Sequence, residues 1–427
     1  MHKVDTLIIG GGITGLSAAS FLGKDHDYLI LEGGEELGGY CKTTTRNGFV
    51  WDYSGHFFHF RDKAIKDYMM SGMDCKVVEV KKITDIDFDG HIIDFPFQYN
   101  VHQLPKKDFI ECLKDMYYLK AVDTSNFKSF VNSTSGKAIA EKFLIPYNEK
   151  LYACDLNKLD AGAMGRFFPK PIIFKELMEK ITSANDYESY NGTFIYPTEG
   201  SYEFIRSLLT RVEETQIWLN TKANDIDPDK KIVFTNKGPI QYNTLINSMP
   251  FDKLYPILYS TPNKNLSSNK VAVFNLGFDK KTKIKTHWRY FPGKEIFYRI
   301  GFYNNILGTD KMSLYVEIGA TSNQRLKEDL LLNEVMKDLK TAGIIKNHKL
   351  VDHQFIVMDP AYVHINKESE LSYKKFCKNF NKQGIYSIGR YGSWTYCSIE
   401  DNIIQAKKLI KKIKKCNITK TTEHKDS

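Results

Sequence analysis

The sequence has few of the features that mark membrane, secreted or metal-binding proteins. None of its apolar runs approaches the roughly 20 residues that a membrane-spanning helix needs. Its seven cysteines are scattered and include no Cys-x-x-Cys pair, which argues against a disulfide framework and against a metal site. The first residues already have the pattern of an apolar strand, so we expect no signal peptide. Reduced thiols in a cytoplasmic protein are the simplest account.

The chain does have an excess of positive charge. Its formal net charge is +9, and part of this excess lies in a lysine-rich stretch over residues 407–415. The simplest interpretation is a terminal helix with a solvated lysine face. The alternatives are a helix in weak contact with an anionic membrane surface and a basic interior that binds a phosphorylated substrate. We expect neither nucleic acid nor stable membrane insertion, and the oligomeric state stays open.

A glycine-rich motif follows the first apolar strand pattern. The strand ends in Gly10-x-Gly12-x-x-Gly15, after which Leu16 begins a helix. Gly10 allows a tight turn, Gly12 leaves room for a pyrophosphate, and Gly15 lets helix and strand pack closely. The second strand ends in Glu32, whose carboxylate can accept hydrogen bonds from ribose hydroxyls. The order of these elements predicts a dinucleotide site.

A second glycine-rich turn indicates which dinucleotide binds. Residues 33–39 follow the acid directly and end in Gly38-Gly39. This arrangement resembles the FAD enzymes of the amine-oxidase and sugar-mutase superfamily, in which the second turn lies near the cofactor phosphates. The resemblance favours FAD over NAD.

The patterns along the chain predict an α/β protein with three units. An inserted helical domain that binds substrate or nucleotide is expected over 100–190, and an antiparallel sheet domain for the substrate over 266–354. The rest of the ordered chain forms a discontinuous Rossmann-type FAD-binding domain, made of residues 1–95, 193–265 and 355–415. Strands are expected over 76–88 and 91–95, with Asp89-Gly90 as the hairpin turn between them. A final helix is expected over roughly 400–415, and residues 416–427 are expected to be a disordered tail.

Several short segments, taken in order, carry a more specific resemblance. They are Tyr53–His56, Phe95–Gln98, Pro146–Tyr152, Asn191–Phe194, Trp288–Pro292, Phe297–Arg299 and Gly389–Tyr396. Together they resemble the UDP-galactopyranose mutase family, and its eukaryotic-type branch in particular, from residue 4 to about 410.

The resemblance implies an unusual isomerase reaction. Pyranose and furanose forms of a UDP-sugar (UDP-galactose or a related sugar) interconvert through an adduct between the sugar and N5 of reduced FAD. NAD(P)H or another reductant activates the cofactor, as expected for an enzyme of polysaccharide biosynthesis. One alternative is an FAD-dependent oxidase or desaturase of the amine-oxidase superfamily. Another is a non-catalytic flavoprotein that binds a membrane or nucleic acid through its lysine helix.

The resemblance also assigns roles to residues. In the family two arginines clamp the diphosphate and a loop histidine lies beside the flavin; the matching residues are Arg299, Arg390 and His56. The residues expected to bind the nucleotide sugar are Phe97, Gln98, Asn148, Tyr152, Asn191, Tyr290, Tyr362 and Tyr396. Those expected to bind FAD are Gly10, Gly12, Thr14, Gly15, Glu32, Gly38, Gly39, Gly55, Gly389, Asp401 and Asn402.

The sequence departs from the family pattern at three places. The family has Gly-x-Arg where this chain has Gly165-Arg166, so the arginine is displaced by one residue. An Asn-Gln pair is replaced by Glu400-Asp401, and Tyr152 stands where tryptophan is more common. The displaced arginine leaves the sugar open, and the base is not certain to be uracil.

Overall fold

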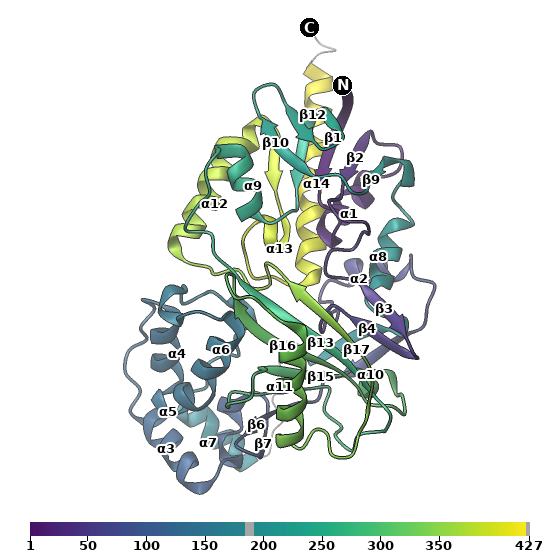
Figure 1. Ribbon diagram of the computed structural model, residues 1–427. Coiled ribbons are helices and arrows are strands. Elements are labelled where there is room, and N and C mark those ends of the chain that lie inside the picture. Colours follow the sequence, from purple (N-terminus) through teal and green to yellow (C-terminus); the bar gives the residue numbers. More distant parts are fainter. Residues whose placement is uncertain (184–191, 424–427) are drawn as a thin grey trace.

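The computed structural model describes residues 1–183 and 192–423. Figure 1 shows a sheet with flanking helices at one end of the molecule, a second sheet in the middle, and a group of helices beside that second sheet. This arrangement confirms the predicted α/β class, with a Rossmann-type unit and an antiparallel sheet. Asn191, one of the predicted sugar-binding residues, lies outside the described residues.

The first sheet has the parallel core of a nucleotide-binding fold. Its order is β10-β11-β12-β1-β2-β9, and β18 pairs with β12. Strands β1 and β2 are buried on both faces, as expected of parallel strands covered by helices. The bounds are β1 His2–Ile9, β2 Tyr28–Leu31, β9 Ile217–Trp218, β10 Ala223–Asp227, β11 Ile232–Thr235, β12 Gly238–Asn247 and β18 Ile385–Ser387.

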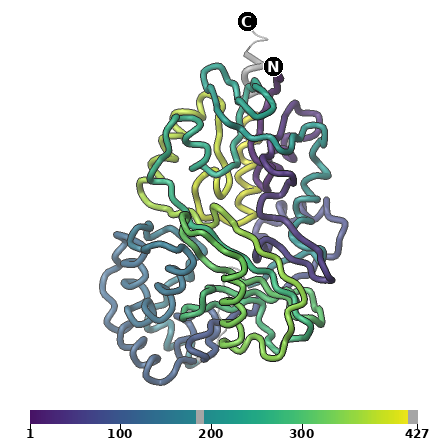
Figure 2. Tube along the Cα trace, viewed as in Figure 1, coloured from purple at the N-terminus to yellow at the C-terminus, as the bar shows by residue number. Residues whose placement is uncertain are grey.

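Helices from both ends of the chain cover this sheet. Helix α1 (Ile13–Leu22) packs against α14 (Ile399–Glu423) and α8 (Tyr202–Leu209), so the first and last parts of the chain lie side by side (Figure 2). Helix α14 continues to Glu423, beyond residue 415 at which the final helix was predicted to end. Other helices near this sheet are α2 Lys63–Met70, α9 Phe251–Tyr259, α12 Lys367–Phe380 and α13 Gly389–Gly392.

The lysines of α14 lie on its exposed side. Lys407, Lys408, Lys411 and Lys412 are exposed, whereas Ile410 and Ile413 on the same helix are buried. The helix is therefore amphipathic, and its lysines form an exposed face, as in the simplest of the predicted interpretations. Within the described ranges 1–183 and 192–423, no helix has the length and apolar composition needed to cross a membrane.

The second sheet is mostly antiparallel and larger than predicted. Its order is β17-β13-β16-β15-β14-β6-β7. The bounds are β6 Thr84–Phe88, β7 His91–Asp94, β13 Asn269–Phe278, β14 Trp288–Tyr290, β15 Arg299–Phe302, β16 Ser313–Thr321 and β17 Leu350–Met358. Asp89 and Gly90, both at positive φ, form the predicted hairpin turn between β6 and β7. Two short helices accompany this part of the chain, α10 Tyr303–Leu307 and α11 Glu328–Thr341.

Two predicted unit boundaries need correction. Strands β6 and β7 fall within residues 1–95, which were assigned to the FAD-binding unit, yet β6 pairs in parallel with β14. The end of β17 likewise falls within 355–415 but pairs with β13. The pairing partners lie far away in the sequence, so the pattern of one strand does not reveal which sheet it joins.

Two small sheets connect the units. The hairpin of β3 (Thr43–Arg46) and β4 (Phe49–Asp52) turns at Asn47 and Gly48, both at positive φ. Strand β5 (Val77–Lys81) pairs with β8 (Thr193–Pro197). The single strand predicted over 76–88 is therefore two strands, β5 and β6, that belong to different sheets.

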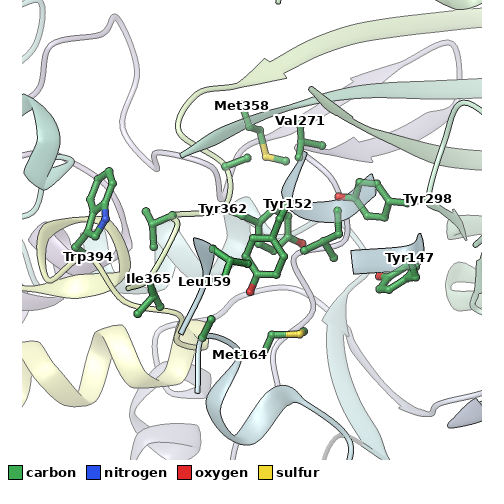
Figure 3. Packing of buried hydrophobic residues seen from close by; sticks show 14 of the residues in the cluster. Tyr147, Tyr152, Leu159, Met164, Val271, Tyr298, Met358, Tyr362, Ile365 and Trp394 are labelled. Carbon is green, nitrogen blue, oxygen red and sulfur yellow. The ribbon is translucent and has the colours of Figure 1, made fainter. Parts of the chain in front are cut away.

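The helical unit lies beside the second sheet. It contains α3 Lys106–Tyr117, α4 Phe127–Ser135, α5 Lys137–Ile139, α6 Ile145–Tyr152 and α7 Phe174–Ser183, with a π-helical turn over Ala140–Leu144. One hydrophobic cluster joins this unit to the sheets. In Figure 3, Tyr152 of α6 lies beside Tyr362, which follows β17, with Val271 of β13 and Met358 of β17 close by. A shared core keeps the three units in one rigid arrangement.

Candidate active site

A cavity of about 680 Å³ lies at the carboxyl ends of β1 and β2. This dinucleotide cavity is lined by most of the residues expected to bind the cofactor: Gly10, Gly12, Thr14, Glu32, Gly38, Gly39, Gly55 and Asn402. Gly15, Gly389 and Asp401 are not in its lining but are neighbours of residues that are. The crevice at the carboxyl ends of parallel strands is where open α/β sheets bind ligands.

The two glycine turns pack against each other. A Cβ on Gly15 would lie 1.9 Å from the carbonyl oxygen of Gly10, so only glycine fits there. A Cβ on Gly12 would lie 3.7 Å from the Cα of Gly39, and the amide of Gly38 donates to the carbonyl of Gly11 at 2.8 Å. Gly12 caps α1 without a side chain, which leaves the first amides of the helix open to the cavity. These amides form an anion site.

Glu32 is held by backbone amides at the end of β2. Its Oε2 accepts from the amide of Gly11 and its Oε1 from the amide of Gly34, both at 2.8 Å. Each carboxylate oxygen keeps a second lone pair, and Glu32 lines the cavity. A fixed carboxylate at this place suits the hydroxyls of a ribose.

The last helix closes the cavity from the other side. Asn402 Oδ1 accepts from the Thr14 hydroxyl at 2.8 Å and from the Arg390 amide at 2.7 Å. A Cβ on Gly389 would lie 2.4 Å from Thr14 Oγ1, so this contact requires glycine. The Thr14–Asn402 bond joins α1 to α14 across almost the whole length of the sequence. The open amides, the carboxylate and the volume of the cavity all fit FAD.

A second cavity, of about 730 Å³, lies between the helical unit and the second sheet. The cations in this substrate cavity are Lys82, Arg166, Lys170 and Arg299. Among the described residues that line it, none is Asp or Glu. Its tyrosines are Tyr147, Tyr290, Tyr315, Tyr362 and Tyr396, and its other aromatic residues are Phe57, Phe95, Phe130, Phe143, Phe167, Phe168 and Trp288. The lining is thus both cationic and aromatic.

The two cavities meet at a common wall. Seven residues line both: Gly55, Phe57, His59, Phe167, Arg299, Tyr362 and Tyr396. A ligand in the substrate cavity would therefore reach the end of the dinucleotide cavity opposite to Glu32. The structure brings both predicted clamp arginines to this junction, because Arg390 also lines the dinucleotide cavity.

Arg299 is bound to a carboxylate that the sequence analysis does not identify. Arg299 on β15 lies directly opposite Glu317 on β16. Its Nε is 2.5 Å from Glu317 Oε2 and its Nη2 is 2.8 Å from Oε1. The Glu317 side chain is 1% exposed. This bidentate pair fixes the orientation of Arg299, which retains further N–H donors for a ligand.

Arg390 is held by aromatic rings and a backbone carbonyl. Its guanidinium carbon lies 4.4 Å from the ring centre of Tyr396 and 5.4 Å from that of Tyr362. Its Nη1 donates to the carbonyl of Cys397 at 3.0 Å. Stacking on two rings restrains the guanidinium without neutralising its charge.

His56 lies in the loop between the two cavities and lines the dinucleotide cavity. Burial and the positive charge of Arg390 lower the pKa of His56 to about 4. Its Nδ1 is buried and accepts or donates no hydrogen bond within the described chain. The imidazole is therefore neutral at pH 7, and one of its ring nitrogens lacks a hydrogen-bond partner among the described residues.

The remaining predicted substrate residues fall into two groups. Asn148, Tyr290, Tyr362 and Tyr396 line the substrate cavity, whereas Phe97, Gln98 and Tyr152 are buried behind its wall. Phe97 stacks on Phe143, a wall residue, with ring centres 5.1 Å apart. Within the described residues, the buried oxygens Asn148 Oδ1 and Gln98 Oε1 lack hydrogen-bond partners. Unpartnered buried acceptors are rare and are typical of ligand sites.

Arg166 is the arginine that is displaced by one residue from the family pattern. It lines the substrate cavity, and its Nη2 donates to Asp401 Oδ2 and, at 3.4 Å, to the Ser398 hydroxyl. Asp401, expected at the cofactor, therefore holds Arg166 and also lies 3.3 Å from Nη2 of Arg61. The change from Asn-Gln to Glu400-Asp401 is explained by these ion pairs.

Some site residues were missed by the sequence analysis. Glu317 is the one charged residue in the apolar strand pattern of β16, and that isolation was a usable signal. Lys82 and His59 carry no such signal, because Lys82 follows another lysine and His59 lies in a run of aromatic residues, as at many positions outside binding sites.

Several solved structures of enzymes share this fold. The family model of the NAD(P)-binding Rossmann-like domain matches residues 8–70. A reduced UDP-galactopyranose mutase has a TM-score of 0.88 at 22% identity, with 96% of this chain and 95% of that chain covered. A putative protoporphyrinogen oxidase from Exiguobacterium scores 0.77 at 17% identity, covering 96% and 98%. A putrescine oxidase scores 0.63 at 13% identity, covering 96% and 99%.

Curated relatives that are similar in sequence include retinol reductases, which are neither mutases nor amine oxidases. The human all-trans-retinol 13,14-reductase is 25% identical over 226 residues, which are 47% of this chain and 33% of the relative. An inactive all-trans-retinol 13,14-reductase of Danio rerio is 43% identical over 51 residues, 12% of this chain and 8% of the relative. The chain thus matches a third or less of the length of these relatives. Together the matches show the fold that these proteins share, and the Rossmann-like domain supports the predicted FAD cofactor.

Proposed function

We propose that this protein is a flavin-dependent nucleotide-sugar mutase that interconverts the pyranose and furanose forms of a UDP-sugar. The observation that carries the proposal is the junction of the two cavities. A cationic, hydroxyl-rich cavity meets the end of a dinucleotide cavity at Arg299, Tyr362 and Tyr396, with Arg390 adjoining. An anionic sugar derivative would fit this junction.

The charge of the substrate cavity favours a nucleoside diphosphate over an amine. Four cations line the cavity, and the described lining residues include neither Asp nor Glu. Two of the four are paired with carboxylates outside this lining, Arg166 with Asp401 and Arg299 with Glu317, and they keep further N–H donors for a ligand. A cationic amine would need a carboxylate or an unobstructed aromatic cage. A diphosphate needs fixed positive charge and hydroxyl donors, which Arg299, Arg390 and the tyrosines supply.

The residues at the junction suit a reaction in which the diphosphate leaves and returns. When bound in its reduced form, FAD would supply the nucleophile for the anomeric carbon of the sugar. Arg299 and Arg390 would stabilise the charge that grows on the departing diphosphate. Because Glu317 and two tyrosine rings already fix the guanidinium groups, little reorganisation is needed at that moment.

The far end of the substrate cavity suits a nucleotide base. Asn148 Oδ1 has no partner within the described residues, while Nδ2 of the same amide donates to the Leu144 carbonyl at 2.6 Å. Phe130 and Phe143 line the same cavity. An amide oxygen beside aromatic rings can accept a hydrogen bond from N3–H of a uracil nucleotide, and the rings can stack on the base.

A second candidate is an FAD-dependent oxidase, desaturase or reductase that acts on an apolar substrate. The aromatic walls of the substrate cavity favour it, as do the retinol reductase relatives. Such an enzyme has no use for two restrained arginines at the cofactor. Retention of activity by an Arg390→Ala variant would therefore favour this candidate.

The test is a turnover assay on the purified holoenzyme reduced with NAD(P)H or dithionite. We expect ring contraction of one member of a panel of UDP-, GDP- and dTDP-pyranoses, without stoichiometric use of the reductant. We expect a UDP-sugar to be the best substrate. Peroxide production with an amine, or hydrogenation of a polyene with stoichiometric use of the reductant, would contradict the proposal.

A further inference from the structure

Glu317 contacts functional groups on both sides of the junction. On one side it holds Arg299 through the bidentate ion pair. On the other side its Oε1 accepts a hydrogen bond from the hydroxyl of Ser54. Ser54 lines the dinucleotide cavity but is not in the lining of the substrate cavity. One buried carboxylate therefore joins the cofactor side to the anion-binding side.

The Ser54–His56 turn depends on outside support. Ser54 has a φ of +74°, a left-handed conformation that costs a residue with a Cβ about 1 kcal/mol or more. The Ser54 hydroxyl accepts from the amide of Gly55 at 2.6 Å, and the Ser54 carbonyl accepts from the amide of His56 at 2.9 Å. A Cβ on Gly55 would lie 2.5 Å from the Tyr315 hydroxyl. The bond to a charged acceptor offsets the strain in this turn.

A contribution to stability does not explain why Glu317 is buried. It lies in β16 between buried apolar neighbours, where a carboxylate adds less stability than an apolar side chain would. Arg299 would bear its full positive charge in a cationic cavity if the carboxylate were absent. The position of Glu317 is explained if it sets the geometry of both neighbours together.

We propose that Glu317 is a positioning residue that couples the Ser54–His56 turn beside the cofactor to the anion-binding orientation of Arg299. Displacement of either neighbour changes the bond that Glu317 makes to the other, so the effect passes in both directions. Thermodynamic coupling of this kind is reciprocal. The identity of the anion as a nucleoside diphosphate rests on the proposed function, whereas the coupling itself does not.

The first test starts from the anion side and needs no nucleotide. Arg299→Lys replaces the forked guanidinium by a point charge that cannot keep both bonds to Glu317. We expect faster amide hydrogen exchange in residues 53–57 of the FAD-loaded variant, although the substitution lies on another strand. The matched control is Arg325→Lys at an exposed position, which should leave this segment unchanged. Unchanged exchange in Arg299→Lys would overturn the proposal.

The second test starts from the cofactor side. Ser54→Ala keeps the Cβ and the strained backbone but removes the bond to Glu317. We expect the dissociation constant of UDP for the reduced holoenzyme, followed by flavin absorbance, to rise about fivefold or more. The control is Ser313→Ala. It removes a buried hydroxyl from β16, and this variant should bind UDP as the wild type does.

A double variant separates coupling from a merely structural role. If Glu317 transmits the effect, Ser54→Ala with Glu317→Gln weakens UDP binding no further than Glu317→Gln alone. Additive losses would overturn the proposal, as would UDP binding that is unaffected by Ser54→Ala. If the wild type binds no UDP, the proposed function fails, and the exchange experiment with Arg299→Lys still decides the coupling.

Discussion

The two cavities that meet at Arg299 are built in different ways. One wall of the dinucleotide cavity is formed by residues 10–39, where glycines admit close approach and amides face inward. The substrate cavity is formed by side chains that come from residues as far apart as Gly55 and Tyr396. That wall of the first cavity is therefore specified by a local pattern, whereas the second cavity depends on how three units pack.

The largest effect expected of a single substitution lies in the local pattern. Gly15→Ala would place a Cβ 1.9 Å from the Gly10 carbonyl, a backbone atom that cannot move away freely. We expect overpacking to cost about 3 kcal/mol of stability and the purified protein to lose its flavin absorbance. Gly343→Ala is the control: its Cβ meets nothing within 4 Å, so the variant bears only the backbone strain of a φ of +68°, about 1 kcal/mol, and FAD should stay bound. An FAD-loaded Gly15→Ala variant would show that the glycine turns do not determine the cavity.

A smaller and more selective effect is expected on the substrate side. Arg390→Ala should retain FAD but lose roughly 3 kcal/mol of transition-state stabilisation, or about two orders of magnitude in kcat. Arg299→Ala is best combined with Glu317→Gln, because Arg299→Ala alone would leave a buried carboxylate without its partner. The control is the exposed residue Arg325, as Arg325→Ala. Turnover near the wild-type rate in Arg390→Ala would remove that residue from the clamp.

The charge of the substrate cavity should also change with pH. Burial lowers the pKa of Lys82 to about 8, and its Nζ lies 5.6 Å from the ring centre of Phe95 and 5.7 Å from that of Trp288. The ammonium is positive below this pKa and neutral above it. Affinity for UDP should therefore fall about fivefold, roughly 1 kcal/mol, as the pH rises through 8. Calorimetric titrations at several pH values would measure the change. In Lys82→Met the dependence should be absent.

The smallest expected effect is on stability. The pKa of His56 in the folded protein, about 4, lies below its ordinary value of 6.5, so the unfolded state binds the proton more readily. The stability that His56 contributes is present above pH 6.5 and is lost as the pH falls toward 4. We expect the Tm of His56→Gln to change less over this range than that of the wild type.

Asp52 also changes the stability of the protein with pH, so the effect of His56 is measured as the difference between the wild type and His56→Gln. Burial raises the pKa of this carboxyl to about 6, so its own contribution to stability falls as the pH rises from about 4 to 6. The Asp52 contribution is common to the wild type and His56→Gln, and it cancels in the difference between their Tm profiles. Identical profiles would mean that His56 is not buried as a neutral ring.

The sequence analysis predicts local features better than long-range ones. The hairpin at Asp89-Gly90 follows from two residues that tolerate positive φ between alternating strands. That β6 pairs with β14 does not follow, since the partners are about two hundred residues apart. The sequence also does not predict which residues lie behind the cavity wall, as Phe97, Gln98 and Tyr152 do. A motif gives the order of residues along the chain and not their depth in the fold.

The sequence by itself determined the cofactor half of this protein, because the turn, the acid and the second glycine pair lie within 39 residues and act through backbone geometry. It also placed two arginines in aromatic, glycine-rich segments. Only the tertiary structure decided that Glu317 restrains one of them, that Arg166 pairs with Asp401, and that two cavities share a wall. Those contacts join side chains from separate strands and helices, and such pairings leave no periodic trace along the chain.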